Sequence, residues 1–222
     1  MKTNKKAKKP FPQFYTINEE IANSITHGIG TGLSVAGLTL LVVLATLYGD
    51  KWQIISFSIY GTTLIILYLA STLYHSFQHP PVKRVFRIID HAAIYLVIAG
   101  TYTPFLLVKM RHIWGWTWLV IIWTLALLGV VYKTFFINRF EILAVVSYAL
   151  MGWMGLIILQ ELLTTVAIGS MIWLGVGGAF YTIGIIFYAW DKIPYNHTIW
   201  HLFVLSGSAC HYFAILLYIS PI

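Results

Sequence analysis

Seven long apolar runs constrain this chain more than any other feature of its sequence. They cover residues 26–48, 52–77, 86–108, 113–131, 142–159, 166–190 and 198–222. Most approach or exceed the roughly 20 residues that a helix needs to cross a ~30 Å hydrocarbon core. No sustained alternation of polar and apolar residues is present, and lipid offers no partners for unpaired backbone groups. The sequence therefore predicts an all-α bundle of seven transmembrane helices.

The composition excludes an ordinary soluble domain. Of the 222 residues, 59% are hydrophobic and only 9% are charged, whereas soluble domains carry about 25% charged residues. We expect a multi-pass protein of the cell membrane, with a basic cytoplasmic tail over residues 1–18 and a seven-helix transmembrane domain over residues 19–222. The single cysteine, Cys210, excludes a disulfide framework and a cysteine-based metal site.

The distribution of basic residues predicts the topology. With the tail placed in the cytoplasm, eleven of the fourteen basic residues fall on the inner side. These are Lys2, Lys5, Lys6, Lys8, Lys9, Lys83, Arg84, Arg87, Lys133, Arg139 and Lys192. The outer side holds only Lys51, Lys109 and Arg111. This asymmetry predicts a cytoplasmic N-terminus and an extracytoplasmic C-terminus. It also explains the formal charge of +7 without a nucleic-acid partner.

A histidine pair opens the last apolar run. His197 and His201 are four residues apart, so one helix face offers both imidazoles to a single metal ion. Such a pair also arises by chance, and its surroundings must decide. The predicted topology places three more ionisable residues in the same layer near the cytoplasmic leaflet: His27 in the opening turn of the first helix, His75 near the inner end of the second, and Asp90 near the start of the third.

This layer has the composition of a catalytic zinc site. Three imidazoles with an open position for water form an established arrangement, in which zinc polarises a carbonyl and lowers the pKa of water toward ~7. Asp90, which we interpret as the only acidic residue clearly inside a span, would receive the proton of that water or hold the water in position. Ser71, four residues before His75, would hydrogen-bond water or substrate, or alternatively the carbonyl four residues earlier.

The remaining histidines receive other roles. His211 shares a face with His197 and His201 but lies about 15 Å deeper. We predict that it makes a helix–helix or water contact, with a proton path as the alternative. His91 is expected to point about 100° away from Asp90, and His79 and His112 to lie in or beside loops.

These motifs together resemble the hemolysin III family, the bacterial branch of the progestin and adiponectin Q receptor superfamily. The resemblance rests on Ser71-Thr-Leu-Tyr-His75, Asp90, His197-Thr-Ile-Trp-His201 followed by His211, and the opening Asn23-Ser-Ile-Thr-His27-Gly28. It implies a seven-helix fold and zinc near the cytoplasmic face, bound by His75, His197 and His201 with Asp90 and Ser71 beside it. It also implies kinship with alkaline ceramidases, which hydrolyse a lipid amide, and links to cytolysis and membrane-lipid homeostasis.

Three functional hypotheses follow. The first is a zinc-dependent hydrolase of a lipid amide or ester at the inner leaflet, or a lipid-homeostasis factor built on that scaffold, with membrane lipids as partners. The second is a pore-forming or cytolytic protein with a structural metal, although the outer halves of the runs lack the polar rings of a conducting lumen. The third is a proton or ion transporter, for which no inverted repeat is visible.

Overall fold

The computed structural model describes residues 15–137 and 139–221, and these residues form helices and turns without a strand. Six helices are long and apolar enough to cross a membrane. They are α1 (Ile17–Tyr48), α2 (Lys51–Ser76), α3 (Pro80–Pro104, continued by a π-helical segment, Phe105–Lys109), α4 (Ile113–Phe136), α7 (Ile168–Ala189) and α8 (Asn196–Tyr218). If a bent pair of shorter helical segments is counted as one further span, the number of spans is seven. The predicted all-α, multi-spanning fold is confirmed.

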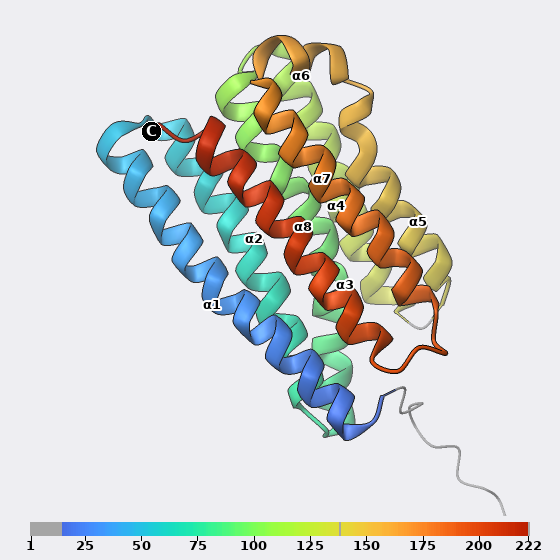
Figure 1. Ribbon diagram of the computed structural model, residues 1–222. Helices are drawn as coiled ribbons and strands as arrows, with labels where there is room; N and C mark the ends of the chain where they lie inside the picture. The colour runs from blue at the N-terminus through green and yellow to red at the C-terminus, as the bar shows by residue number, and fades with distance from the viewer. Residues whose placement is uncertain (1–14, 138, 222) are drawn as a thin grey trace, which may run out of the picture.

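The helices run up and down beside one another, and α8 lies against the beginning of the chain (Figure 1). α2 packs between α1 and α3, α3 also packs against α4, and α8 packs against both α1 and α7. The contact between α1 and α8 brings the first and last helices of the chain together. Residues of α1 can therefore support side chains of α8, although about 175 residues separate them.

α1 begins at Ile17, nine residues before the predicted start of the first span. Thr16 caps it: the Thr16 side chain accepts a hydrogen bond from the Glu19 amide, and the Glu19 carboxylate accepts one from the Thr16 amide. This reciprocal capping box satisfies two amides at the helix start. The helix thus begins two residues before the predicted domain boundary, and residues 1–14 of the predicted tail lie outside the described part of the chain.

The third span, α3, also begins earlier than predicted. Pro80 and Pro81 occupy the first two positions of α3, six residues before the apolar run predicted to begin at residue 86. Proline suits that position because its fixed φ fits the helix and its missing N–H would have no partner there. As a result, Lys83 and Arg87 belong to the first turns of α3.

The fifth span is bent rather than continuous over 142–159. α5 (Glu141–Gly152) passes into a 3₁₀ turn (Trp153–Leu156), and α6 (Leu159–Thr165) continues at an angle of 52°. The Tyr102 hydroxyl lies 3.1 Å from the Met151 carbonyl and 2.8 Å from the Gly152 carbonyl, and it accepts a hydrogen bond from the Gly155 amide. One partly buried hydroxyl thereby satisfies backbone groups that the break would leave unpaired in lipid.

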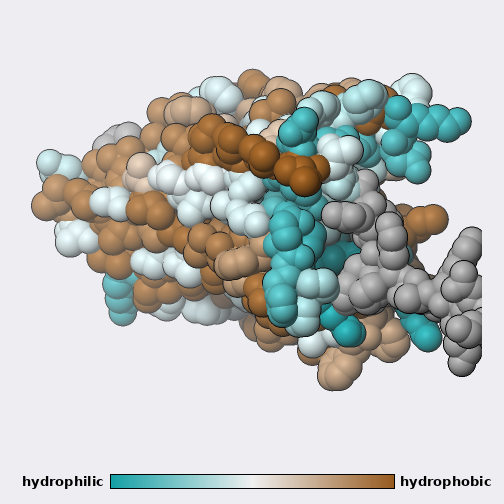
Figure 2. All heavy atoms as spheres, turned by 90° about the horizontal axis from the view of Figure 1, so that it is seen from below, coloured by the Kyte–Doolittle hydropathy of each residue, from teal (hydrophilic) through white to brown (hydrophobic). Residues whose placement is uncertain are grey.

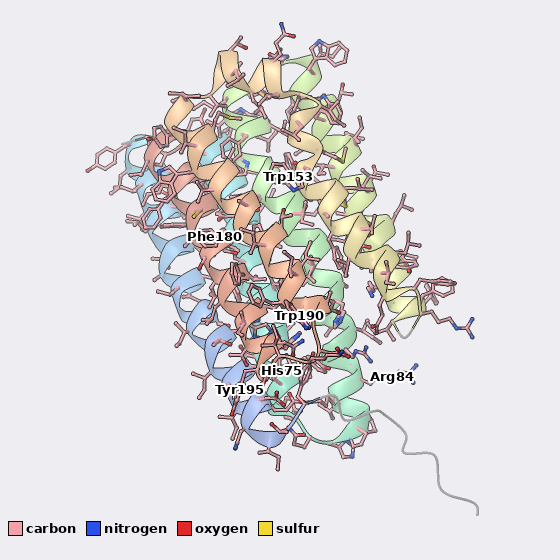
Figure 3. All side chains as sticks on the ribbon, turned by 45° about the vertical axis from the view of Figure 1, so that its right-hand side comes forward. His75, Arg84, Trp153, Phe180, Trp190 and Tyr195 are labelled. Atoms are coloured by element: carbon pink, nitrogen blue, oxygen red, sulfur yellow. The ribbon has the colours of Figure 1, made fainter. Side chains whose placement is uncertain are left out.

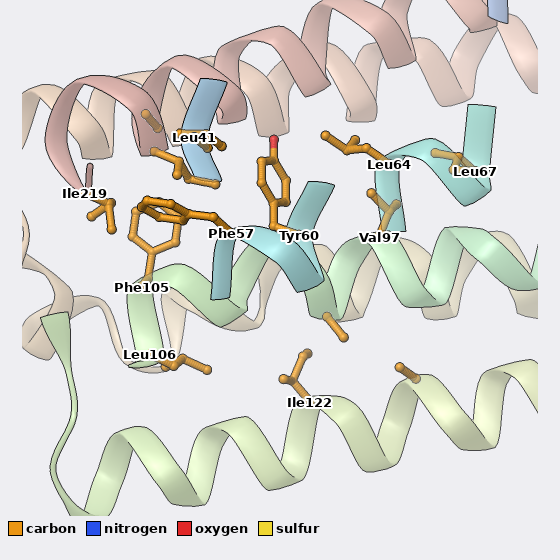
Figure 4. Close-up of a cluster of buried hydrophobic side chains, with 14 of the residues drawn as sticks. Leu41, Phe57, Tyr60, Leu64, Leu67, Val97, Phe105, Leu106, Ile122 and Ile219 are labelled. Carbon is orange, nitrogen blue, oxygen red and sulfur yellow. The ribbon is translucent and has the colours of Figure 1, made fainter. Parts of the chain in front are cut away.

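The interior is apolar over most of the bundle's length. Figure 4 shows Leu41, Phe57, Tyr60, Phe105 and Ile219 packed between helices, and all five are at most 3% exposed. Seen from below, hydrophilic side chains gather at one end of the molecule, whereas apolar side chains cover much of the remaining face (Figure 2). We call the end of the bundle where α1, α3 and α8 begin the basic end.

Candidate metal centre

Three buried histidines meet at the basic end of the bundle. His75 comes from the last turn of α2, and His197 and His201 come from the first two turns of α8. Each offers one ring nitrogen, and the three nitrogens lie within 4.8 Å of one another. The centroid of the His75 ring is 5.1 Å from that of His197 and 5.2 Å from that of His201. Figure 3 shows His75 at the same end of the molecule as Tyr195 and Arg84.

The three side chains fit a single metal ion. Nitrogen ligands about 2.1 Å from one tetrahedral ion stand about 3.4 Å apart, so side-chain movements of about 1.4 Å or less would complete the group. His75 Nε2 and His197 Nδ1 are buried and have no hydrogen-bond partner among the described residues. A buried polar atom without a partner costs about 1–3 kcal/mol, and coordination would remove that cost. The group could therefore hold a metal ion.

Glu20 of α1 orients His75. Its Oε2 lies 2.6 Å from His75 Nδ1, and its Oε1 lies 2.8 Å from Lys83 Nζ. When a carboxylate accepts a hydrogen bond from Nδ1–H, the ring keeps its proton on Nδ1 and Nε2 is free to bind a metal. Metal-binding histidines usually have such a partner. The interpretation of Asp90 as the only acidic residue inside a span is wrong, because Glu20 is 5% exposed within α1. The capping-box pattern from Thr16 to Glu19 was the sequence signal for the earlier helix start.

His201 is oriented by α1 as well. Its Nδ1 lies 3.2 Å from the Asn23 carbonyl oxygen and 3.2 Å from Thr26 Oγ1. The Nδ1–H donates to the Asn23 carbonyl oxygen, so Nε2 is the nitrogen without a proton. The Thr198 hydroxyl donates to the Asn23 side-chain oxygen and adds a second link between α1 and α8. Two of the three candidate ligands thus depend on residues of the first helix.

His27 belongs to the same layer but not to the ligand group. Because α1 begins at Ile17, His27 lies ten residues into the helix rather than in its opening turn. Its ring stacks on that of His201, with centroids 3.5 Å apart and planes inclined by 11°. It therefore packs against a candidate ligand.

Asp90 is buried on α3 and lines the same cavity as His197 and His201. Its Oδ2 lies 3.3 Å from His91 Nδ1, so the prediction that His91 points away from it is wrong. His91 Nδ1 also lies 2.8 Å from the Arg87 carbonyl oxygen. The imidazole folds back along its own helix, where its nitrogen reaches the adjacent carboxylate.

Ser71 is placed one turn before His75 on α2, and its hydroxyl oxygen is buried. This oxygen has no hydrogen-bond partner among the described residues. Of the two alternatives that the sequence left open, a hydrogen bond to the carbonyl four residues earlier is not formed. The hydroxyl remains available to a ligand.

A cavity of about 390 Å³ extends from the histidines into the bundle. Its walls come mainly from α3, α5, α7 and α8, and they are mostly apolar, with side chains such as Ile94, Val145, Leu162 and Ile185. Trp153, labelled in Figure 3, also lines it. The volume lies within the range of small-molecule sites in proteins. The polar group of His197, His201 and Asp90 thus opens onto an apolar chamber.

Tyr15 covers the histidines at the basic end. Its ring centroid is 4.8 Å from that of His197 and 6.0 Å from that of His75. Burial raises the pKa of the Tyr15 hydroxyl well above its usual value, so this group is neutral at physiological pH. No sequence pattern had pointed to Tyr15.

The more distant histidine of α8 has a structural contact. His211 Nε2 lies 3.3 Å from the Leu174 carbonyl oxygen of α7. The predicted helix–helix contact of His211 is confirmed.

The fold and the site define a multi-pass helical membrane protein with a buried three-histidine group at one end of its bundle. Comparison with known proteins makes this class specific: the family profile described as "Haemolysin-III related" matches residues 15–212. The chain belongs to this family. It is 50% identical to the "Hemolysin-3 homolog" of Bacillus subtilis (strain 168) over 204 residues, which are 92% of this chain and 96% of that protein.

Two further relatives show how far the similarity extends. "Hemolysin-3" of Bacillus cereus is 47% identical over 205 residues, covering 92% of this chain and 94% of that protein. The human "Monocyte to macrophage differentiation factor" is 31% identical over 214 residues, covering 93% of this chain and 87% of its own length. The similarity to all three spans nearly the whole bundle.

Proposed function

We propose that this protein is a zinc-dependent hydrolase of an amide or ester bond in a membrane lipid. The observation that carries the proposal is a mostly apolar cavity lined by Asp90 and by His197 and His201, two members of the three-histidine group. An apolar chamber suits an acyl chain, and the histidine layer suits the carbonyl group at the end of that chain. The positive-inside distribution of basic residues supports access from the inner leaflet.

Each polar residue has a role in this proposal. His75, His197 and His201 hold the zinc ion, which supplies a Lewis acid for a carbonyl and makes water acidic near neutral pH. Asp90 accepts the proton that the water loses and later returns it to the leaving group, as a general base and acid. His91, 3.3 Å from Asp90, keeps that carboxylate in place. The Ser71 hydroxyl donates a hydrogen bond to the substrate.

The test combines metal analysis with hydrolysis of lipid amides and esters by the purified protein. The wild-type chain should contain one zinc ion, and the His197→Ala, His201→Ala double variant should contain almost none. Asp90→Asn should keep the ion and lose about 10²–10⁴-fold in hydrolysis, the usual contribution of general acid–base catalysis. Asp191→Asn, an exposed position in the loop before α8, is the matched control. Wild-type zinc in the double variant, or full hydrolysis by Asp90→Asn, would refute the proposal.

A cytolytic protein with a structural metal is the second candidate, and the names of the two Bacillus relatives favour it. In that case the metal would join α2 to α8, and Asp90→Asn would lyse red cells as well as the wild type. Loss of lysis only in the double histidine variant, with no lipid hydrolysed by any form, would favour this candidate. The same purified variants therefore separate the two functions.

A further inference from the structure

Lys133 lies three residues before the end of α4 and is only 1% exposed. It makes no hydrogen bond or ion pair with the residues that the structure describes. A lysine near the end of a transmembrane helix ordinarily extends its ammonium group to the aqueous interface. Here the side chain is directed into the bundle instead, where a charge without a partner is costly.

Lys133 lines the cavity that contains His197, His201 and Asp90. The cavity's two described acidic residues already have partners. Asp90 contacts His91, and Glu141 accepts a hydrogen bond from Arg87 at 3.0 Å. The ammonium group of Lys133 is thus available to an anion that enters the cavity.

We propose that Lys133 binds the anionic group, a phosphate or a carboxylate, of a lipid whose acyl chain fills the cavity. The apolar walls accept the chain, and a buried ammonium group forms a strong charge-assisted contact with an anionic oxygen. This inference rests on the proposed function and narrows it, because it makes an anionic lipid the preferred ligand over a neutral one. Lys133 acts in recognition and takes no part in the hydrolytic step.

The test measures binding without turnover. The purified protein in a neutral detergent receives an equimolar mixture of oleoyl lysophosphatidate, oleate and monooleoyl glycerol, and native mass spectrometry counts the bound lipids. The wild type should prefer the two anionic lipids to monooleoyl glycerol by about tenfold or more, since a buried charge pair typically contributes at least that much. The stronger of the two anionic ligands then distinguishes a phosphate site from a carboxylate site.

Variants test whether the Lys133 side chain causes the preference for anionic lipids. Lys133→Met should bind the three lipids about equally, with binding of monooleoyl glycerol unchanged, and Lys133→Arg should keep the preference. Lys192→Met removes an exposed charge from the loop before α8 and is the matched control. If Lys133→Met does not fold, Lys133→Gln replaces it in the same assay.

Two results would overturn the inference: a wild type without a preference for anionic lipids, or a folded Lys133→Met or Lys133→Gln variant that keeps it. Failure of the proposed function is a separate outcome. A preference that depends on Lys133 in a protein that hydrolyses no lipid would support the binding site and refute the hydrolase. Hydrolysis of an anionic lipid with the same efficiency by wild type and Lys133→Met would refute the binding site alone.

Discussion

Replacing Glu20 with glutamine should weaken metal binding although Glu20 is not a ligand. The carboxylate contacts two groups, His75 Nδ1 at 2.6 Å and Lys83 Nζ at 2.8 Å. An amide cannot serve both. If its oxygen faces His75, its NH₂ group meets the ammonium of Lys83. If its NH₂ group faces His75, Nδ1 must accept, and the ring proton moves to Nε2, the atom that would bind the metal.

The size of the effect follows from the burial and the length of this contact. Removing an outer partner of a metal-binding histidine typically costs 10–100-fold in metal affinity, which is about 1.4–2.8 kcal/mol at 1.4 kcal/mol per tenfold. We expect Glu20→Gln near the upper end, because the contact to His75 is short and both side chains are buried. The thermal stabilisation produced by a fixed zinc concentration should fall in parallel, since ligand binding adds to folding stability.

The assay is a zinc titration of the purified protein against a competing chelator, followed by thermal melts with and without zinc. Glu19→Gln is the matched control, since Glu19 lies next to Glu20 but accepts its hydrogen bonds from Thr16 and from the Tyr195 amide. Glu19→Gln should bind zinc as the wild type does. A Glu20→Gln variant with wild-type zinc affinity would show that the carboxylate does not control the orientation of His75.

Two further predictions concern packing and topology. Gly177→Ala should lower stability by about 1–3 kcal/mol, because its Cβ would approach His211 Nε2 to 2.6 Å and the Gly207 carbonyl oxygen to 3.0 Å. Gly175→Ala, with no atom within 4 Å of the new Cβ, should leave the melting temperature unchanged or raise it, and an equal loss in both variants would contradict this packing argument. A reporter fused to the C-terminus should lie outside the cytoplasm, as the basic residues predict, and cytoplasmic activity of the fusion would place the histidine layer at the opposite leaflet.

Much of the candidate site could be predicted because its key residues sit at helical spacing in apolar runs. The four-residue interval of His197 and His201 placed both on one face, and the order of the runs brought His75 to the same end. Hydropathy could not place Glu20 inside the first helix. Glu20 lies in a polar segment before the apolar run, and the composition of such a segment is the same whether it is helical or extended. The bend after α5 was missed for a related reason: the Tyr102 hydroxyl that satisfies its backbone comes from another helix.

The sequence by itself determined the class of the protein, the number and order of its apolar spans, and the three histidines that meet. These depend on local properties, since transfer of apolar side chains into lipid and the helical repeat both act over one segment. Only the tertiary structure decided which neighbours complete the site. Glu20 meets His75 because α1 packs on α2, the Asn23 carbonyl meets His201 because α1 packs on α8, and Lys133 faces the cavity because α4 turns that side inward. Such pairings join residues distant in sequence, and their energies depend on how helices pack.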